Sequence, residues 1–159
     1  AAGVLGNRAL GYHVVQVNVD VQDRTVRQGD VLVIRRPAPE ERLHAGLVVT
    51  YDRFATYSIY HVRGDQIATI WAAAGDAVEW QHDKQRFLIN GRVIDAPPNI
   101  RAAWHDHPDM FLDLAADRVF LFPTLGQTDL DHMLLPTSAV DGVVKRIQDP
   151  PDRRKDLST

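Results

Sequence analysis

The segment from residue 67 to residue 95, IATIWAAAGDAVEWQHDKQRFLINGRVID, constrains the fold of this chain most strongly. It contains β-rich stretches separated by two turn signals. Gly75-Asp76 indicates a tight turn, because glycine tolerates positive φ and aspartate hydrogen-bonds its own backbone. Asn90-Gly91 is the strongest short-range signal for a β-hairpin. Two hairpins in so short a segment predict an antiparallel β core.

The segments on either side of this core also favour strands. Residues 12–21 alternate valine with polar side chains, which predicts a half-buried strand. Further β-rich segments are expected at residues 31–34, 47–51, 55–62, 119–122 and 140–147. The predicted fold class is therefore mostly β.

The chain is long enough for one hydrophobic core, and we expect one domain over residues 12–148. Residues 1–11 are expected to be a flexible lead-in or the remnant of an upstream anchor. Residues 95–118 include two consecutive prolines and no two-residue alternation, so we expect an irregular excursion with one short helix. Residues 149–159 are polar and proline-containing, and we expect them to be disordered.

The composition excludes several classes of function. The 18 basic and 21 acidic residues nearly balance, so no nucleic-acid partner is expected. The absence of cysteine excludes disulfides, thiol catalysis and cysteine metal sites. No phosphate loop or dinucleotide fingerprint is present, and no cofactor is expected. The chain begins without methionine, so membrane contact through an anchor upstream of residue 1 stays open.

The motifs in the core segment resemble the second conserved box of the signal peptidase I family. That box runs Lys-Arg-Val-Val-Gly-Leu-Pro-Gly-Asp-x-Val-Glu, followed after a turn by Leu-x-Ile-Asn-Gly-Lys. Gly75-Asp76, Val78-Glu79 and residues 88–92 fall in register with it.

Other segments resemble the same family in the same order. Residues 25–33 resemble the end of its first box, with Gly29-Asp30 setting the register. Residues 44–49, 118–122 and 135–145 resemble later strands of the family. The motif residues that the resemblance places around the cleft are Gly29, Asp30, Gly75, Asp76, Asn90 and Gly91.

This resemblance implies a fold of coiled antiparallel β-sheets, which LexA-type self-cleaving repressors share. It also implies that the domain is tethered to a bacterial membrane on its extracytoplasmic face. The family is catalytic through a serine nucleophile and a desolvated lysine base. In the register above, the serine falls on Val21 and the lysine on Ala68. Because these residues have neither a hydroxyl nor an amine, enzyme activity is uncertain, and an inactive homologue is the leading expectation.

A divergent active peptidase with another nucleophile remains an alternative. Residues 1–57 contain no serine, so the first available one is Ser58, which Lys145 would have to activate. Thr25 is the other candidate nucleophile, because it lies in the segment that resembles the first box. Either arrangement would require a base at hydrogen-bond distance.

His105, His107 and Asp109 form the one cluster with metal-ligating residue types. A site would need another ligand, and His132, flanked by acidic residues, is the candidate. The favoured interpretation is a solvated polar loop, so no metal is expected.

The leading functional prediction is a noncatalytic domain that binds an extended peptide or a signal-peptide-like segment by strand addition, with residues 17–21 as the edge. An envelope scaffold or interaction domain with a protein partner is a further alternative. Trp71, Trp80 and Trp104 are expected to pack the core rather than rest on lipid.

Overall fold

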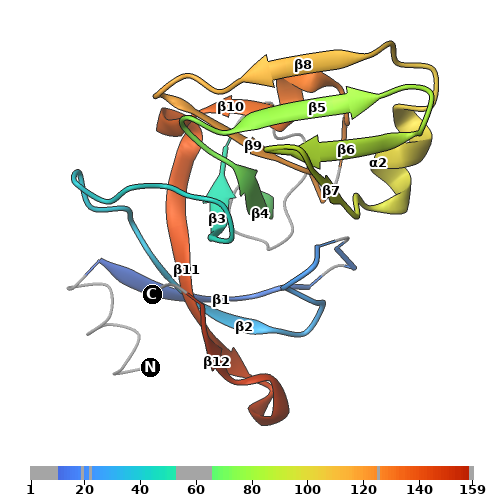
Figure 1. Ribbon diagram of the computed structural model, residues 1–159. Helices are drawn as coiled ribbons and strands as arrows, with labels where there is room; N and C mark the ends of the chain where they lie inside the picture. The colour runs from blue at the N-terminus through green and yellow to red at the C-terminus, as the bar shows by residue number, and fades with distance from the viewer. Residues whose placement is uncertain (1–10, 19, 22, 53–65, 125, 158–159) are drawn as a thin grey trace.

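The computed structural model describes residues 11–18, 20–21, 23–52, 66–124 and 126–157. The chain is mostly β and forms two antiparallel sheets, as predicted (Figure 1). The predicted strand at residues 55–62, and Ser58 within it, lie outside the described residues. Among the described residues, none of the helices combines the length and apolar character needed to cross a bilayer.

The first sheet has the strand order β1-β2-β11-β3-β4-β9-β10, with β12 paired to β11. Its strands are β1 (Tyr12–Gln16), β2 (Val31–Arg35), β3 (Val48–Tyr51), β4 (Gln66–Ala72), β9 (Arg118–Leu121), β10 (Leu134–Pro136), β11 (Val140–Asp149) and β12 (Lys155–Asp156). The second sheet has the order β7-β6-β5-β8. Its strands are β5 (Ala77–Gln81), β6 (Arg86–Ile89), β7 (Arg92–Ile94) and β8 (Met110–Asp113).

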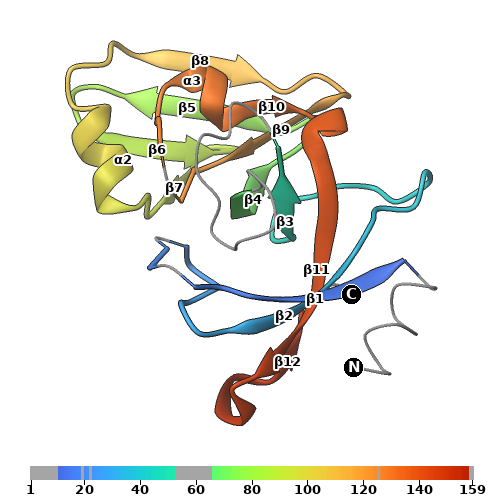
Figure 2. The same ribbon diagram turned by 180° about the vertical axis from the view of Figure 1, so that it is seen from behind.

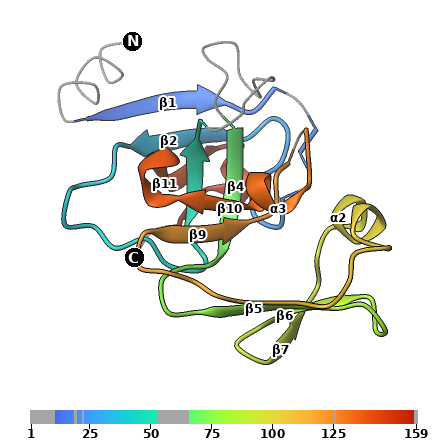
Figure 3. The same cartoon turned by 90° about the horizontal axis from the view of Figure 1, so that it is seen from above.

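Short helices lie between the strands. They are α2 (Pro98–Ala103), α3 (Leu130–Met133) and the 3-10 turns η1 (Thr137–Ala139) and η2 (Pro151–Arg153). Helix α2 lies at one end of the second sheet in both side views (Figures 1 and 2). Viewed from above, the second sheet lies against one side of the first (Figure 3).

The two sheets are held together by an aromatic cluster. Trp80 and Phe87 of the second sheet are fully buried, and so is Phe120 of β9 in the first sheet. The Phe87 ring centroid lies 5.1 Å from that of Trp104 and 6.1 Å from that of Phe120. Trp80 and Trp104 therefore pack the core as predicted, whereas Trp71 is only half-buried.

The predicted Asn90-Gly91 hairpin is confirmed between β6 and β7. Both residues have positive φ, 52° and 78°, as a two-residue type I′ turn requires. The Asn90 side chain also accepts a hydrogen bond from the N–H of Ala77 (2.8 Å) and donates one to Asp76 (3.0 Å). Two of the motif turns are thus joined to each other.

Two segments of the domain differ from the predictions. The first strand ends at Gln16 rather than at Val21, although Val17 still exchanges backbone hydrogen bonds with Gly29 and Asp30, and Val21 is buried in the core. Residues 95–118 contain the expected short helix, but also β8, which pairs with β5 along its whole length. That pairing brings together segments far apart in the sequence, so local patterning does not reveal it.

The expectation of disorder for residues 149–159 is wrong for the part that is described. This tail forms η2 and then β12, which pairs with β11. Leu157 packs against the core, and the Arg153 guanidinium bonds both carboxylate oxygens of buried Asp30 (2.7 and 2.8 Å). A polar tail becomes ordered here because a buried charge elsewhere in the chain provides its partner.

Candidate functional site

The loop between β1 and β2 reaches β4 through the side chain of Asp23. Its carboxylate accepts hydrogen bonds from the backbone N–H groups of Thr25 (2.9 Å) and Val26 (3.0 Å) in its own loop. It also accepts hydrogen bonds from the N–H (2.9 Å) and hydroxyl (3.0 Å) of Thr69 on β4. Four donors therefore converge on one carboxylate where the loop and the strand meet.

The two positions predicted from the dyad do not form one site. Val21 packs in a core cluster with Ile67, whereas Ala68 packs in a different cluster with Val49 and Tyr51. Side chains alternate across a strand, so Ile67 and Thr69 share the face that meets the loop, and Ala68 lies on the other face. The residues that meet are Asp23 and Thr69.

Sequence reasoning missed this pair. Asp23 reads locally as the start of a turn, and it does bond the backbone two and three residues later. Its bond to Thr69 spans 46 residues, and no local signal indicates it.

Thr25, the alternative nucleophile within the described residues, has no amine base beside it. The Thr25 hydroxyl lies 3.5 Å from the hydroxyl of Thr69, a second alcohol. The Lys145 amine donates instead to Glu41 (2.8 Å), far from this junction in the fold. Burial raises the pKa of Glu41, but the hydrogen bonds from Lys145 and from the Ala38 N–H outweigh this and leave that pKa below its usual value. No lysine amine of the described residues is hydrogen-bonded to the Thr25 hydroxyl.

The edge of β4 away from β3 pairs with β9 at Ile70 and Ala72, and its remaining part is partly closed to strand addition. The Ile70 N–H donates a hydrogen bond to the Leu47 carbonyl, on the β3 side of β4. Because backbone groups of successive residues point alternately to the two edges of a strand, those of Ile67 and Thr69 point to the opposite edge. There the Thr69 N–H donates a hydrogen bond to Asp23, and the Ile67 carbonyl accepts one from the buried hydroxyl of Thr124 (2.9 Å). An incoming peptide would have to displace these side chains.

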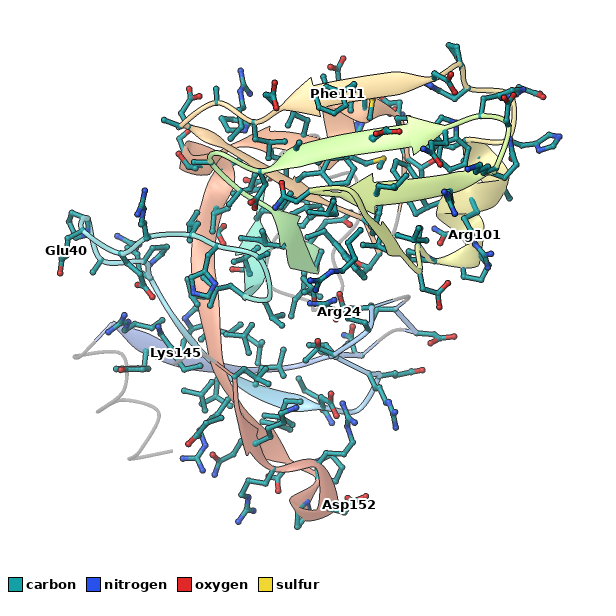
Figure 4. The ribbon with its side chains drawn as sticks, in the orientation of Figure 1. Arg24, Glu40, Arg101, Phe111, Lys145 and Asp152 are labelled. Atoms are coloured by element: carbon teal, nitrogen blue, oxygen red, sulfur yellow. The ribbon has the colours of Figure 1, made fainter. Side chains whose placement is uncertain are left out.

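A pocket of about 330 Å³ opens beside this junction. Its lining consists of Asp23, Arg24, Trp71, Asp95, Ala96, Pro97, Pro98, Arg101 and Phe122. The Arg24 guanidinium carbon lies 4.2 Å from the centroid of the Trp71 ring, a cation–π contact. Figure 4 shows Arg24 between the two sheets and Arg101 on α2.

A second pocket of about 370 Å³ shares Arg24 and Trp71 with the first. Its other lining residues are Ala45, Ile89, Asn90, Arg92 and Ile94. We call the two pockets together the Arg24–Trp71 groove. Sequence reasoning singled out Trp71 and Asn90 for other reasons and gave Arg24 no binding role.

The predicted motif residues have mainly structural roles. Asp30 is buried with 1 % of its surface exposed, and burial raises its pKa, but hydrogen bonds from Arg153 and the Arg27 N–H outweigh this and hold that pKa below its ordinary value. Gly29, Gly75 and Gly91 occupy positive-φ turns.

The residues of the candidate metal cluster, in the loop at positions 105–109, make contacts other than metal ligation. His105 pairs with Gln85 (2.9 Å), and the His107 ring stacks on Trp104 with centroids 4.0 Å apart. Asp109 accepts the N–H of His82 (2.7 Å), and His132 lies against Asp129. Within the described ranges, no three metal-ligating side chains are grouped together.

No protein-family model matches the chain, and no curated protein is significantly similar to it. The resemblance to signal peptidases therefore depends on the ordered motifs of the sequence.

Proposed function

We propose that this protein is a signal-peptidase-like domain without peptidase activity, which binds an extended peptide in the Arg24–Trp71 groove. The observation that carries the proposal is the junction at Asp23. A carboxylate that accepts four hydrogen bonds occupies the meeting point of loop and strand, and an open groove adjoins it. In this proposal the domain acts at the extracytoplasmic face of a bacterial membrane, on signal-peptide-like segments.

The junction is unsuited to peptide hydrolysis. A hydroxyl nucleophile needs a neighbouring base with a free lone pair. The Asp23 carboxylate is a weak base whose oxygens are already engaged by Thr25, Val26 and Thr69. Binding a peptide requires none of these groups to react.

The groove is suited to side chains of a peptide. Small-ligand pockets combine apolar walls with a few polar groups, at volumes of roughly 300–1,000 Å³. Here Trp71 and Phe122, with ring centroids 5.4 Å apart, form an apolar wall beside Arg24. Two pockets that share one wall can accept two side chains from a single extended segment.

Two measurements test the proposal. Incubation with a fluorophosphonate probe and with a signal-peptide substrate is expected to give neither labelling nor cleavage; either result would show an active peptidase. Anisotropy of a fluorescein-labelled peptide ending in Ala-x-Ala is expected to show saturable binding. Absence of binding would favour the scaffold alternative.

A variant pair locates the binding. Trp71→Ala is expected to weaken peptide binding at least tenfold, a loss of about 1.4 kcal/mol, because it removes the shared wall of both pockets. Phe111→Ala is the matched control, since Phe111 is an exposed aromatic residue outside the groove. Circular dichroism checks that both variants fold.

A further inference from the structure

The groove contains three arginines that have no acidic partner among the described residues. Arg24 lines both pockets, Arg92 lines the second and Arg101 lines the first. All three are exposed, and none is within ion-pair distance of a described carboxylate. By contrast, Arg35 and Arg153 are each paired with a carboxylate at less than 3 Å. The charge of the groove arginines is therefore available to a ligand.

The acidic residues of the groove do not neutralise this charge fully. Asp23 lines the first pocket, but its oxygens are held by four donors of the protein itself. Asp95 is exposed at the first pocket, and the lining of the second contains no acidic residue. A chain of formal net charge −3 thus presents a locally cationic groove.

The stacking of Arg24 on Trp71 favours a carboxylate as the group recognised. An aromatic ring covers one face of the guanidinium, and the N–H donors project from its edge. Two parallel N–H donors match the two oxygens of a carboxylate, and such bidentate pairs are the stronger charge-assisted bonds. Trp71, Phe122 and the prolines offer apolar contacts to the neighbouring residue of the peptide.

We infer that the Arg24–Trp71 groove selects extended peptides that carry an acidic side chain next to an apolar one. This inference rests on the proposed peptide-binding function and specifies its ligand class. Arg24 is the principal contact, and Arg92 and Arg101 raise the local potential on either side.

The experiment compares two labelled peptides with the protein by fluorescence anisotropy: fluorescein-Ala-Leu-Ala-Glu-Ala-Leu-Ala and the same peptide with Gln in place of Glu. The Glu peptide is expected to bind about tenfold more tightly than the Gln peptide at low salt, because it can form one bidentate ion pair with Arg24. The preference should shrink as salt is raised, because the site is open to solvent.

Variants test whether the preference for the Glu peptide depends on the groove. Arg24→Gln should abolish the difference between the two peptides, and Arg24→Lys should retain part of it, because lysine keeps the charge but not the planar fork. Arg42→Gln is the matched control, an exposed arginine in the loop between β2 and β3 that lines neither pocket. Figure 4 places Glu40 of that loop on the opposite side from Arg101.

The outcomes separate the two claims. Equal, saturable binding of both peptides would overturn the acidic preference and leave peptide binding intact. Failure of both peptides to bind would overturn the proposed function together with the inference. A Glu preference that survives Arg24→Gln would place the acidic contact elsewhere and overturn the assignment.

Discussion

At the scale of single residues, Asp23 has the largest structural consequence. Its carboxylate is the acceptor for two N–H groups of its own loop and for both polar groups of Thr69 that face it. These hydrogen bonds connect the loop to β4.

Asp23→Ala should therefore lower the free energy of unfolding by about 2 kcal/mol, because donors of buried Val26 and Thr69 lose a charged acceptor. Urea denaturation followed by fluorescence measures this. Asp83→Ala, in an exposed turn, is the control and should change stability little. Equal midpoints for the two variants would mean that water replaces the Asp23 carboxylate without cost.

Gly142 on β11 is required by close packing rather than by its backbone angles. A Cβ at this position would lie 2.6 Å from Cγ2 of Ile34 and closer still to the Thr50 hydroxyl. Both neighbours are β-branched and stiff at χ1, so they cannot move away easily.

Gly142→Ala is expected to destabilise the protein by about 1–3 kcal/mol, the usual cost of overpacking a core. Thermal unfolding by circular dichroism measures the change. Ser138→Ala, an exposed position just before β11, serves as the comparison. A rise in stability with Gly142→Ala would show that β11 can shift and that the packing is looser than described.

At the scale of elements, the tail supports the loop that carries the candidate site. Arg153 of η2 bonds both oxygens of Asp30, and it also donates to the Thr25 carbonyl (2.9 Å). The tail thus reaches the same loop that Asp23 connects to β4. A helical turn and a two-residue strand position a loop more than 100 residues earlier in the chain.

This contact predicts a pH-dependent stability. The folded pKa of Asp30 is below its unfolded value of about 4, so its contribution is present above that value and is lost as pH falls through the folded pKa. Arg153→Gln removes the hydrogen bonds that contribute most to lowering the pKa of Asp30. The variant should be about 2 kcal/mol less stable at pH 7, and its difference from the original protein should shrink near pH 3.

Urea denaturation at pH 7, 5 and 3 measures the difference. Arg154→Gln is the matched control, since Arg154 is an exposed neighbour whose guanidinium bonds Gln148 and Asp149 rather than Asp30. A deficit of Arg153→Gln that stays constant with pH would contradict the assignment to the Asp30 carboxylate.

At the scale of the whole molecule, the aromatic cluster described above joins the two sheets into one unit. Phe87 and Trp80 of the second sheet share this cluster with Ala72 of β4 and Phe120 of β9. The short Gly75-Asp76 turn connects β4 directly to β5, so the sheets are also adjacent along the chain. The groove lies where these two sheets and α2 come together (Figure 4).

We therefore expect one cooperative unfolding transition, with coincident curves for far-UV circular dichroism and tryptophan fluorescence. Phe87→Ala should lower stability by about 3–5 kcal/mol and shift both curves together. Val93→Ala, at an exposed position on β7, provides the comparison. Two separated transitions would show that each sheet folds independently.

The sequence by itself determined the β character, the strands with regular patterns and the Asn90-Gly91 hairpin. These features depend on periods of two residues and on φ preferences of single residues, which neighbouring positions reveal. Resemblance to a family also directed attention to Val21 and Ala68 as positions without reactive groups.

Only the tertiary structure decided which residues meet. Asp23 with Thr69, Asp30 with Arg153, and Arg24 with Trp71 are contacts between segments far apart in the chain. The face of β4 that meets the loop depends on strand register, and a shift of one residue exchanges Ala68 for Thr69. Local sequence patterns do not encode that register, because it follows from how the strands pair and how the core is filled.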